Sequence, residues 1–179
     1  MNIDYDFNTV DGVNYTNEQI TQIEKGIAHG LTETQIKTYA RPEFSALDMR
    51  VIRKAIEQSF SQDEVKMLTN TSDLLYKRKE IKKAIKHKIC DEGIKILSDS
   101  MFDAEQAREI RKGFEHGLTF KQVLIYAWSD YPEYHVFARY PSEYMKEIRK
   151  ALEAGTNEEY VIECTQLPFW EMRKKLRGM

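Results

Sequence analysis

The segment EIRKGFEHGLT, residues 109–119, contains the pattern that decides the fold. Its apolar residues recur at every fourth position: Ile110, Phe114 and Leu118. Residues at this spacing lie along one side of an α-helix, which is typical of a helix with one buried face. Gly117 suits the left-handed residue after a helix end, and Thr119 can cap a following helix. The segment therefore predicts a packed helix, a tight turn and a second helix.

The same pattern returns along the chain at a fixed interval. Each copy opens on an isoleucine; the first four of these residues are 29 residues apart, and a fifth follows after 38. We call them the opening isoleucines and number other positions relative to them: Ile23, Ile52, Ile81, Ile110 and Ile148. A sixth, partial copy has Met172 in this place. Such regular self-similarity predicts stacked helical units.

Other positions of each copy support the same prediction. Positions −3, +4 and +8 are mostly apolar and extend the buried stripe, while position +3 is always glycine or alanine and lets a neighbouring helix approach closely. At +9 most copies have Ser, Thr or Asn, followed in three copies by Gln or Glu three residues later, which predicts a capped second helix. We therefore expect an all-α array or bundle of about five helix-turn-helix repeats of 29 residues.

The third copy departs most from the pattern. Arg78 lies in its apolar stripe, Lys88 and Cys90 lie at its turn, and Gly93 replaces the capping Gln or Glu. Two interpretations are open: a distorted unit, or a bend between two halves of the chain.

Domain organisation follows from the extent of the repeat. The repeats cover residues 16–179 and are interrupted by an insertion near 128–138, and a chain of 179 residues fits one ordinary domain. Residues 1–15 lie outside the repeat and combine aspartates with aromatic residues. This N-terminal segment either caps the first unit or reaches a partner.

Composition excludes several classes of protein. No apolar stretch approaches the roughly 18 residues of a membrane span, and the acidic N-terminus is unlike a signal peptide. We expect a soluble, cytoplasmic protein. Its two cysteines, Cys90 and Cys164, form no CxxC pair, and His29, His87 and His116 recur at +6 without a second ligand beside them. With no recognisable catalytic motif either, we expect neither an enzyme, nor a cofactor, nor a metal site.

Basic residues are the first candidates for binding a partner. Positions +1 and +2 form a basic pair in five of the six copies, and stacking would align these pairs into a ridge. The candidates, with Lys86 from the basic run at 76–88, are Arg53, Lys54, Lys82, Lys83, Lys86, Arg111, Lys112, Arg149 and Lys150. For the three arginines an alternative is open, because each has a glutamate four residues later that can pair with it on the helix surface. The lysines at +2 have no such partner in their own unit, so they are the better candidates for contacting phosphate or an acidic protein surface.

Aromatic residues are the second group of candidates. Trp128, Tyr131 and Tyr134 lie in and beside the insertion, and insertions in repeat proteins often lie on the binding face. Other rings of this region, Tyr126 and Tyr140, are instead expected to fill core positions that correspond to Tyr39 and Phe44.

The repeat resembles a known group of proteins. EIRKGFEHGL, YARPEF at 39–44 and YAWSDYPEY at 126–134 together resemble short helical repeats in proteins of phages and mobile elements of Firmicutes, over roughly residues 17–179. That group includes type II-A anti-CRISPR proteins. The resemblance implies a non-enzymatic inhibitor in the bacterial host cell that binds a CRISPR effector nuclease or its guide-loaded complex.

Two further hypotheses come from the residues themselves. A nucleic-acid-binding or regulatory module would use the same lysines on phosphate, although the net charge of −2 is unlike that of most such domains. A self-associating scaffold would form a homodimer through the aromatic insertion.

Overall fold

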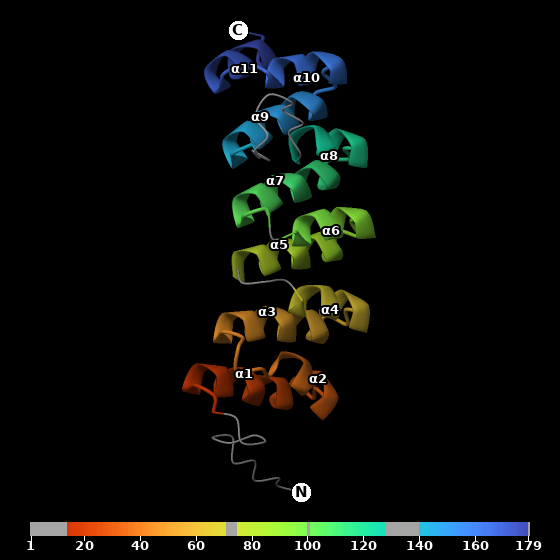
Figure 1. Cartoon of the computed structure of the whole chain (residues 1–179). Coiled ribbons are helices and arrows are strands. Elements are labelled where there is room, and N and C mark those ends of the chain that lie inside the picture. The colour runs from red at the N-terminus through yellow and green to blue at the C-terminus, as the bar shows by residue number, and fades with distance from the viewer. Residues whose placement is uncertain (1–13, 71–74, 100, 128–139, 179) are drawn as a thin grey trace, which may run out of the picture. The chain divides into compact units, whose positions relative to one another are not determined.

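The described residues of the computed structural model, 14–70, 75–99, 101–127 and 140–178, form helices and no strand. The longer helices are α1 (Asn17–Ala28), α3 (Ala46–Glu57), α5 (Leu75–Lys86), α7 (Ala104–Glu115) and α9 (Ser142–Glu153). The shorter ones are α2 (Glu33–Tyr39), α4 (Gln62–Thr69), α6 (Asp91–Ser98), α8 (Phe120–Ala127), α10 (Glu158–Thr165) and α11 (Phe169–Leu176). Over these residues the all-α prediction is confirmed, and long and short helices alternate as far as α10 (Figure 1).

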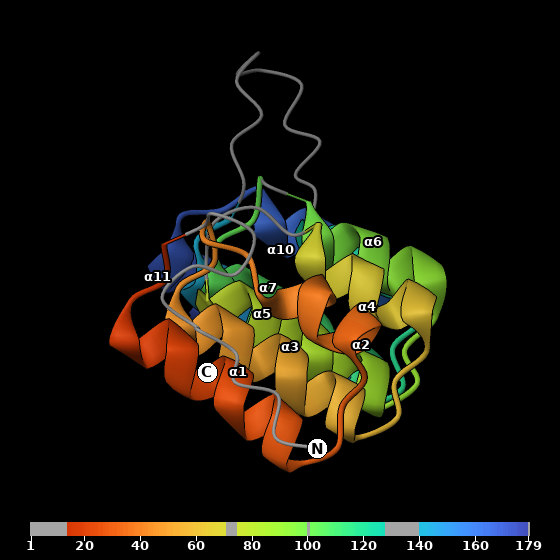
Figure 2. The ribbon, with the colours of Figure 1, turned by 90° about the horizontal axis from the view of Figure 1, so that it is seen from below.

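The chain forms two compact units that meet within the sequence of α5, Met1–Lys82 and Lys83–Met179. In the N-terminal unit α3 packs against α1, α2 and α4. Seen from below, α1 and α3 lie on one side of this unit and α2 and α4 on the other (Figure 2). In the C-terminal unit α7 packs against α6, α8 and α9, and α9 packs against α8, α10 and α11. Both units therefore place long helices beside long helices.

The opening isoleucines and Met172 are buried, as the apolar pattern predicts. The prediction was wrong for one member of the stripe, because Ile27 is 43% exposed. Of its counterparts at +4 in later copies, Ile56, Ile85 and Leu152 are buried and Phe114 is half-buried. Within the described residues α1 is the first helix of the chain.

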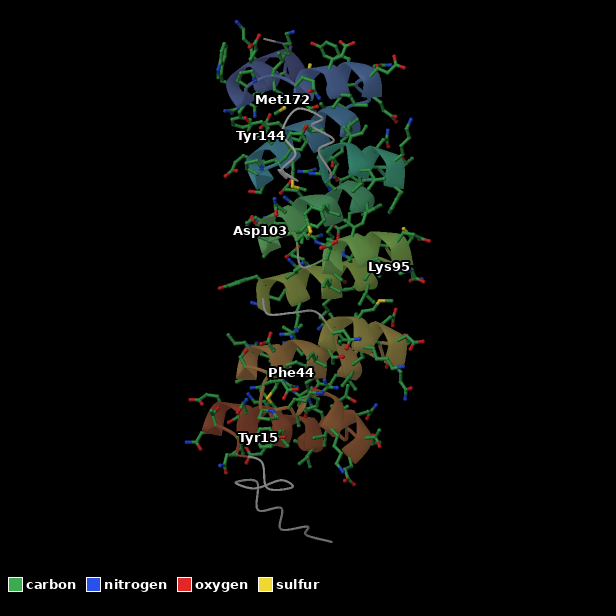
Figure 3. The ribbon with its side chains drawn as sticks, in the orientation of Figure 1. Tyr15, Phe44, Lys95, Asp103, Tyr144 and Met172 are labelled. Atoms are coloured by element: carbon green, nitrogen blue, oxygen red, sulfur yellow. The ribbon has the colours of Figure 1, made fainter. Side chains whose placement is uncertain are left out.

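Arg78 is buried in the stripe rather than turned to solvent. Its guanidinium lies 2.6 Å from the Asp48 carboxylate, and its Nε donates to the carbonyl of Leu68 at 3.0 Å. The guanidinium carbon also lies 4.8 Å from the centre of the Phe44 ring, which is labelled in Figure 3. A buried cation needs a counter-charge and filled hydrogen-bonding positions. These partners let the third copy keep an arginine where other copies have an apolar residue.

The five turns after the long helices share one backbone conformation. Position +7 is left-handed at Gly30, Gly117 and Gly155, with φ of 77°, 87° and 79°, as predicted. Ser59 and Lys88 adopt the same conformation, with φ of 60° and 55°. In each turn the N–H of position +8 donates to the carbonyl of position +3, at 2.9 to 3.2 Å. This bond satisfies a carbonyl at the helix end and directs the chain into the next helix.

The predicted caps of the short helices are confirmed in four copies. Thr32 and Ser61 form capping boxes with Gln35 and Glu64. The corresponding pair in the fourth copy, Thr119 and Gln122, exchanges the same two bonds at 2.9 and 3.2 Å. Asn157 accepts a bond from the backbone N–H of Tyr160. In the third copy Cys90 makes no side-chain cap, in line with its departure from the pattern.

In two copies the small residue at +3 makes room for a tyrosine from the short helix of the same unit. A Cβ on Gly26 would lie 1.9 Å from the Tyr39 hydroxyl, and one on Gly113 would lie 2.0 Å from the Tyr126 hydroxyl. The copies with alanine at +3 have smaller residues thirteen positions later, in the pairs Ala55 and Leu68, Ala84 and Leu97, and Ala151 and Cys164. Glycine therefore occurs where a tyrosine must fit.

Candidate binding surface

The three arginines of the predicted ridge are buried. Arg53, Arg111 and Arg149 have exposed fractions of 3%, 7% and 3%. Each pairs with the glutamate four residues later, Glu57, Glu115 and Glu153, so the alternative reading of these residues is confirmed. The expected ridge of exposed arginines is therefore corrected, because their side chains are taken up by intramolecular ion pairs.

A histidine of the preceding copy joins each of these pairs. The Nδ1 atoms of His29, His87 and His116 lie 2.7, 2.8 and 2.8 Å from the same three carboxylates. Position −1 of the preceding copy completes the cluster at two places: Glu109 pairs with Arg149 at 2.9 Å, and Gln22 accepts from Arg53 at 3.3 Å. The recurring histidines thus link successive copies, which accounts for their spacing.

The electrostatics of these clusters is visible in Glu57. Burial alone would raise the pKa of its carboxyl group, but hydrogen bonds from His29 and Arg53 prevail and lower it.

At the corresponding positions of the second and third copies the chain has Gln58, Lys82 and Lys86 instead of His, Arg and Glu. The cluster therefore cannot form from these residues. Lys82 is half-buried and Lys86 is exposed.

The lysines at +2 differ in their exposure. Lys54, Lys83 and Lys150 are exposed. Lys112 is half-buried, and its Nζ lies 3.3 Å from the Glu109 carboxylate, three residues earlier on the same helix. For Lys112 the prediction that no partner exists in its own unit was wrong. It considered only residues four positions away and overlooked the neighbour at three.

A second row of cations was missed in the sequence. Position −2 carries a basic residue in four consecutive copies: Arg50, Lys79, Arg108 and Lys146. All four are exposed, and each is four residues before the lysine at +2, on the same side of its helix. The basic residue recurring at a fixed position was a signal in the sequence that could have revealed them.

Within the C-terminal unit these residues define one surface. We call it the C-terminal basic face: Arg108 and Lys112 on α7, with Lys146 and Lys150 on α9. Because α7 packs on α9, neighbouring pairs are separated by about one interhelical distance, roughly 8–10 Å. Within the described residues neither Lys146 nor Lys150 has an acidic group within 4 Å, so their charge is available to a partner.

The N-terminal unit has a related surface with apolar neighbours. Arg50 and Lys54 lie on α3 and Lys79 lies on α5, and all are exposed. Position −5 of these two helices carries Leu47 and Tyr76, which are 51% and 65% exposed. The ammonium group of Lys79 lies 5.0 Å from the centre of the Tyr76 ring. On α7 and α9 the same position is occupied by acidic residues instead, Glu105 and Glu143.

The aromatic candidates divide into two groups. Trp128, Tyr131 and Tyr134 lie outside the described residues, so their expected contact with a partner stays a prediction. Tyr126 and Tyr140 are buried, like Tyr39 and Phe44, which confirms their expected place in the core. Burial also raises the pKa of the Tyr39 hydroxyl, to about 12. That hydroxyl lies 3.2 Å from the carbonyl of Gln22, to which it donates.

The described residues of these surfaces include exposed cations and one exposed ring, Tyr76. They contain no group of three His, Cys, Asp or Glu side chains that could hold a metal ion. None of their helices has both the length and the apolar character of a membrane span. Comparison with known proteins adds no identity, since no family model, curated protein or solved structure matches the chain.

Proposed function

We propose that this chain is a non-enzymatic binding protein, built from about five helix-turn-helix repeats of 29 residues, that docks on a negatively charged macromolecular surface. The observation that carries the proposal is the C-terminal basic face, whose four cations lie on adjacent helices. Lys146 and Lys150 are exposed and make no ion pair within the described part of the chain. Such clustering concentrates positive potential on one surface, although the whole chain carries a net charge of −2.

The resemblance of the repeat to proteins of phages and mobile elements suggests the kind of target. We propose a guide-loaded CRISPR effector nuclease of type II-A, which the chain would inhibit by occupying a nucleic-acid or acidic protein surface of the complex. The mixed character of the C-terminal basic face supports a macromolecular complex, because Glu105 and Glu143 flank its cations. The inhibitor would then act in the bacterial cytoplasm without a cofactor.

A pull-down with a charge-reversed surface tests this proposal. The variant Lys146→Glu/Lys150→Glu removes the two unpaired cations of α9. A control is Lys95→Glu/Lys121→Glu, which changes the net charge equally on the short helices α6 and α8; Lys95 is labelled in Figure 3. This control also breaks the ion pair between Lys121 and Glu158, 3.1 Å apart near the surface, which contributes little to stability. The wild-type chain and the control should co-elute with a guide-loaded type II nuclease and lower its DNA cleavage.

The basic-face variant should lose binding by roughly tenfold or more, since each phosphate or carboxylate contact contributes on the order of 1 kcal/mol. Equal binding by the two double variants would contradict the proposal, as would co-elution of the wild-type chain with no nuclease.

A second candidate function is a regulatory module that binds nucleic acid by itself. The C-terminal basic face favours it, because cations on adjacent helices suit a phosphate backbone. Recovery of nucleic acid without a nuclease in the same pull-down would select this alternative. A homodimer formed through the aromatic insertion also stays a proposal, and sizing chromatography of the purified chain tests it.

A further inference from the structure

The C-terminal basic face continues onto α11, where its row of cations ends in an exposed tryptophan. Met172 is buried and takes the place of an opening isoleucine, which puts Trp170 at position −2 and Lys174 at position +2. Trp170 is 69% exposed, the largest exposed fraction among the apolar side chains described as exposed. A large ring held in water at the end of a basic row is a feature that core packing does not explain.

The register that places Trp170 beside Lys146 is fixed by two contacts between α9 and α11. The Tyr144 ring stacks on Phe169, the residue before Trp170, with 4.4 Å between ring centres. Position −1 of α9, Glu147, pairs with position +1 of α11, Arg173, at 3.9 Å.

The second contact repeats an earlier one, since Glu109 of α7 pairs in the same way with Arg149 of α9. α11 therefore follows α9 as α9 follows α7, and the side chains at −2 of the two helices are neighbours. Figure 3 labels Tyr144 and Met172 on these helices.

Further contacts hold both ends of α11 in place. Glu147 accepts two hydrogen bonds from Arg177 at 2.7 and 2.8 Å, which ties the end of α11 to α9. Pro168 precedes α11 and fixes the chain at its first turn. Trp170 is thus presented by a helix that is anchored at both ends. A rigid exposed ring loses little conformational entropy when a partner stacks on it.

From this arrangement we infer that the C-terminal unit contains a binding site for single-stranded nucleic acid, with the backbone along Lys146, Lys150 and Lys174 and a base stacked on Trp170. Proteins that bind single strands combine these two elements, a row of cations for the phosphates and an aromatic surface for the bases. A duplex could use the lysines, but its bases are already stacked and would leave the ring unused. The acidic neighbours Glu143 and Glu171 lie on the same helices and limit how much non-specific binding the cations produce.

The inference rests on the proposed function, because it assigns the partner of the same basic face. Its test follows the tryptophan fluorescence of the full chain, and Trp170→Ala identifies the part of the signal that comes from Trp170. The probes are an oligo-dT strand of roughly 20 nucleotides and a duplex of the same length, at low salt. Saturable quenching by the strand, with little change from the duplex, is the expected result. No saturable quenching and no binding of the labelled strand would overturn the inference, as would equal quenching by the duplex.

Variants separate stacking from charge in the same experiment. Trp170→Ala should weaken binding of a labelled strand by roughly 5- to 100-fold, and Trp170→Phe by less, because a smaller ring still stacks. Lys146→Glu/Lys150→Glu should reduce the dependence of log affinity on log salt by about 1.4, and Lys95→Glu/Lys121→Glu should change it little. Circular dichroism of each variant checks that the helices are retained.

The outcomes also separate this inference from the proposed function. Full binding by Trp170→Ala would overturn the stacked base. If the strand does not bind, but the basic-face variant still loses the nuclease, the inference fails and the proposed function stands. If the basic-face variant binds both the strand and the nuclease as tightly as wild type does, both the inference and the proposed function fail.

Discussion

At the scale of single residues, the pairing of Gly113 with Tyr126 shows how a change at one position is compensated at another. The Tyr126 hydroxyl lies 3.3 Å from the carbonyl of Glu109, to which it donates, and it occupies the space that a side chain at position 113 would need. Burial raises the pKa of this hydroxyl above its ordinary value, so it stays protonated and remains a hydrogen-bond donor. Ala55 and Leu68 hold the same two positions in the second copy. Either pair can fill the space, whereas alanine with tyrosine cannot.

A double-mutant cycle at this pair tests the compensation. Alanine in place of a helical glycine normally stabilises by about 1 kcal/mol. For Gly113→Ala we expect the opposite, a loss of roughly 1–3 kcal/mol, because the added Cβ would lie 2.0 Å from the Tyr126 hydroxyl and force the ring to move. Urea unfolding should show that Gly113→Ala/Tyr126→Leu loses less than the sum of its single variants. Strictly additive effects would contradict direct contact as the reason for the glycine.

The sequence shows that the residue at position +3 is small, but it did not reveal which side chain fills the space beside it. A small residue between two helical segments is usually taken as a place where helices approach each other. Identifying the tyrosine of the same unit required the geometry of the intervening turn, with its left-handed residue at +7. In the sequence, the available indication was that the two copies with glycine at +3 have a tyrosine thirteen residues later: Gly26 with Tyr39, and Gly113 with Tyr126.

At the scale of the helices, ion pairs across successive copies tie the long helices together. One example is the buried Glu147 of α9, which binds Arg173 of α11 and Arg177 at the end of that helix. The hydrogen bond from Arg177 lowers the pKa of the Glu147 carboxyl, against the opposing effect of burial, and nearby positive charges lower it further. A carboxyl whose pKa is lower in the folded chain stabilises the fold at pH values above its unfolded pKa.

The sign of the pH dependence follows from this shift. As the pH falls below about 4.3, the ordinary value of a glutamate, and then through the lower folded pKa, the stabilisation by Glu147 is lost. We expect Glu147→Gln to lower the melting temperature at pH 7. The difference in melting temperature between the variant and wild type should decrease as the pH approaches 3. Thermal unfolding followed by circular dichroism between pH 3 and 7 measures both effects. A difference between variant and wild type that is the same at every pH would contradict the assignment.

The exposure of the basic residues could have been predicted more fully from helix geometry. Successive residues of an α-helix are turned by about 100°, so positions −2 and +2 both point away from the opening isoleucine. Position +1 is turned by only about 100° from it and lies at the flank, where the next helix packs. This is why Arg53, Arg111 and Arg149 are buried while the cations at −2 and +2 are exposed. Treating +1 and +2 as one pair concealed the difference.

At the scale of the whole molecule, the sequence predicted the fold class and the caps but not the division into two compact units. The position of that division coincides in sequence with the third copy, which has no capping Gln or Glu and has Lys82 and Lys86 in place of the linking Arg and Glu. A bend between halves was one of the two interpretations that the departures of this copy left open. The partner could not be predicted from these residues, because a face of lysine and arginine side chains fits any polyanion.

The most direct test of the account measures the affinity of the full chain for a guide-loaded type II nuclease at two salt concentrations. Wild type is compared with Lys146→Glu/Lys150→Glu and with the control Lys95→Glu/Lys121→Glu. We predict that the basic-face variant binds roughly tenfold or more weakly and loses part of the salt dependence, while the control stays within about twofold of wild type. Indistinguishable affinities for the two double variants would show that the C-terminal basic face is not the binding surface.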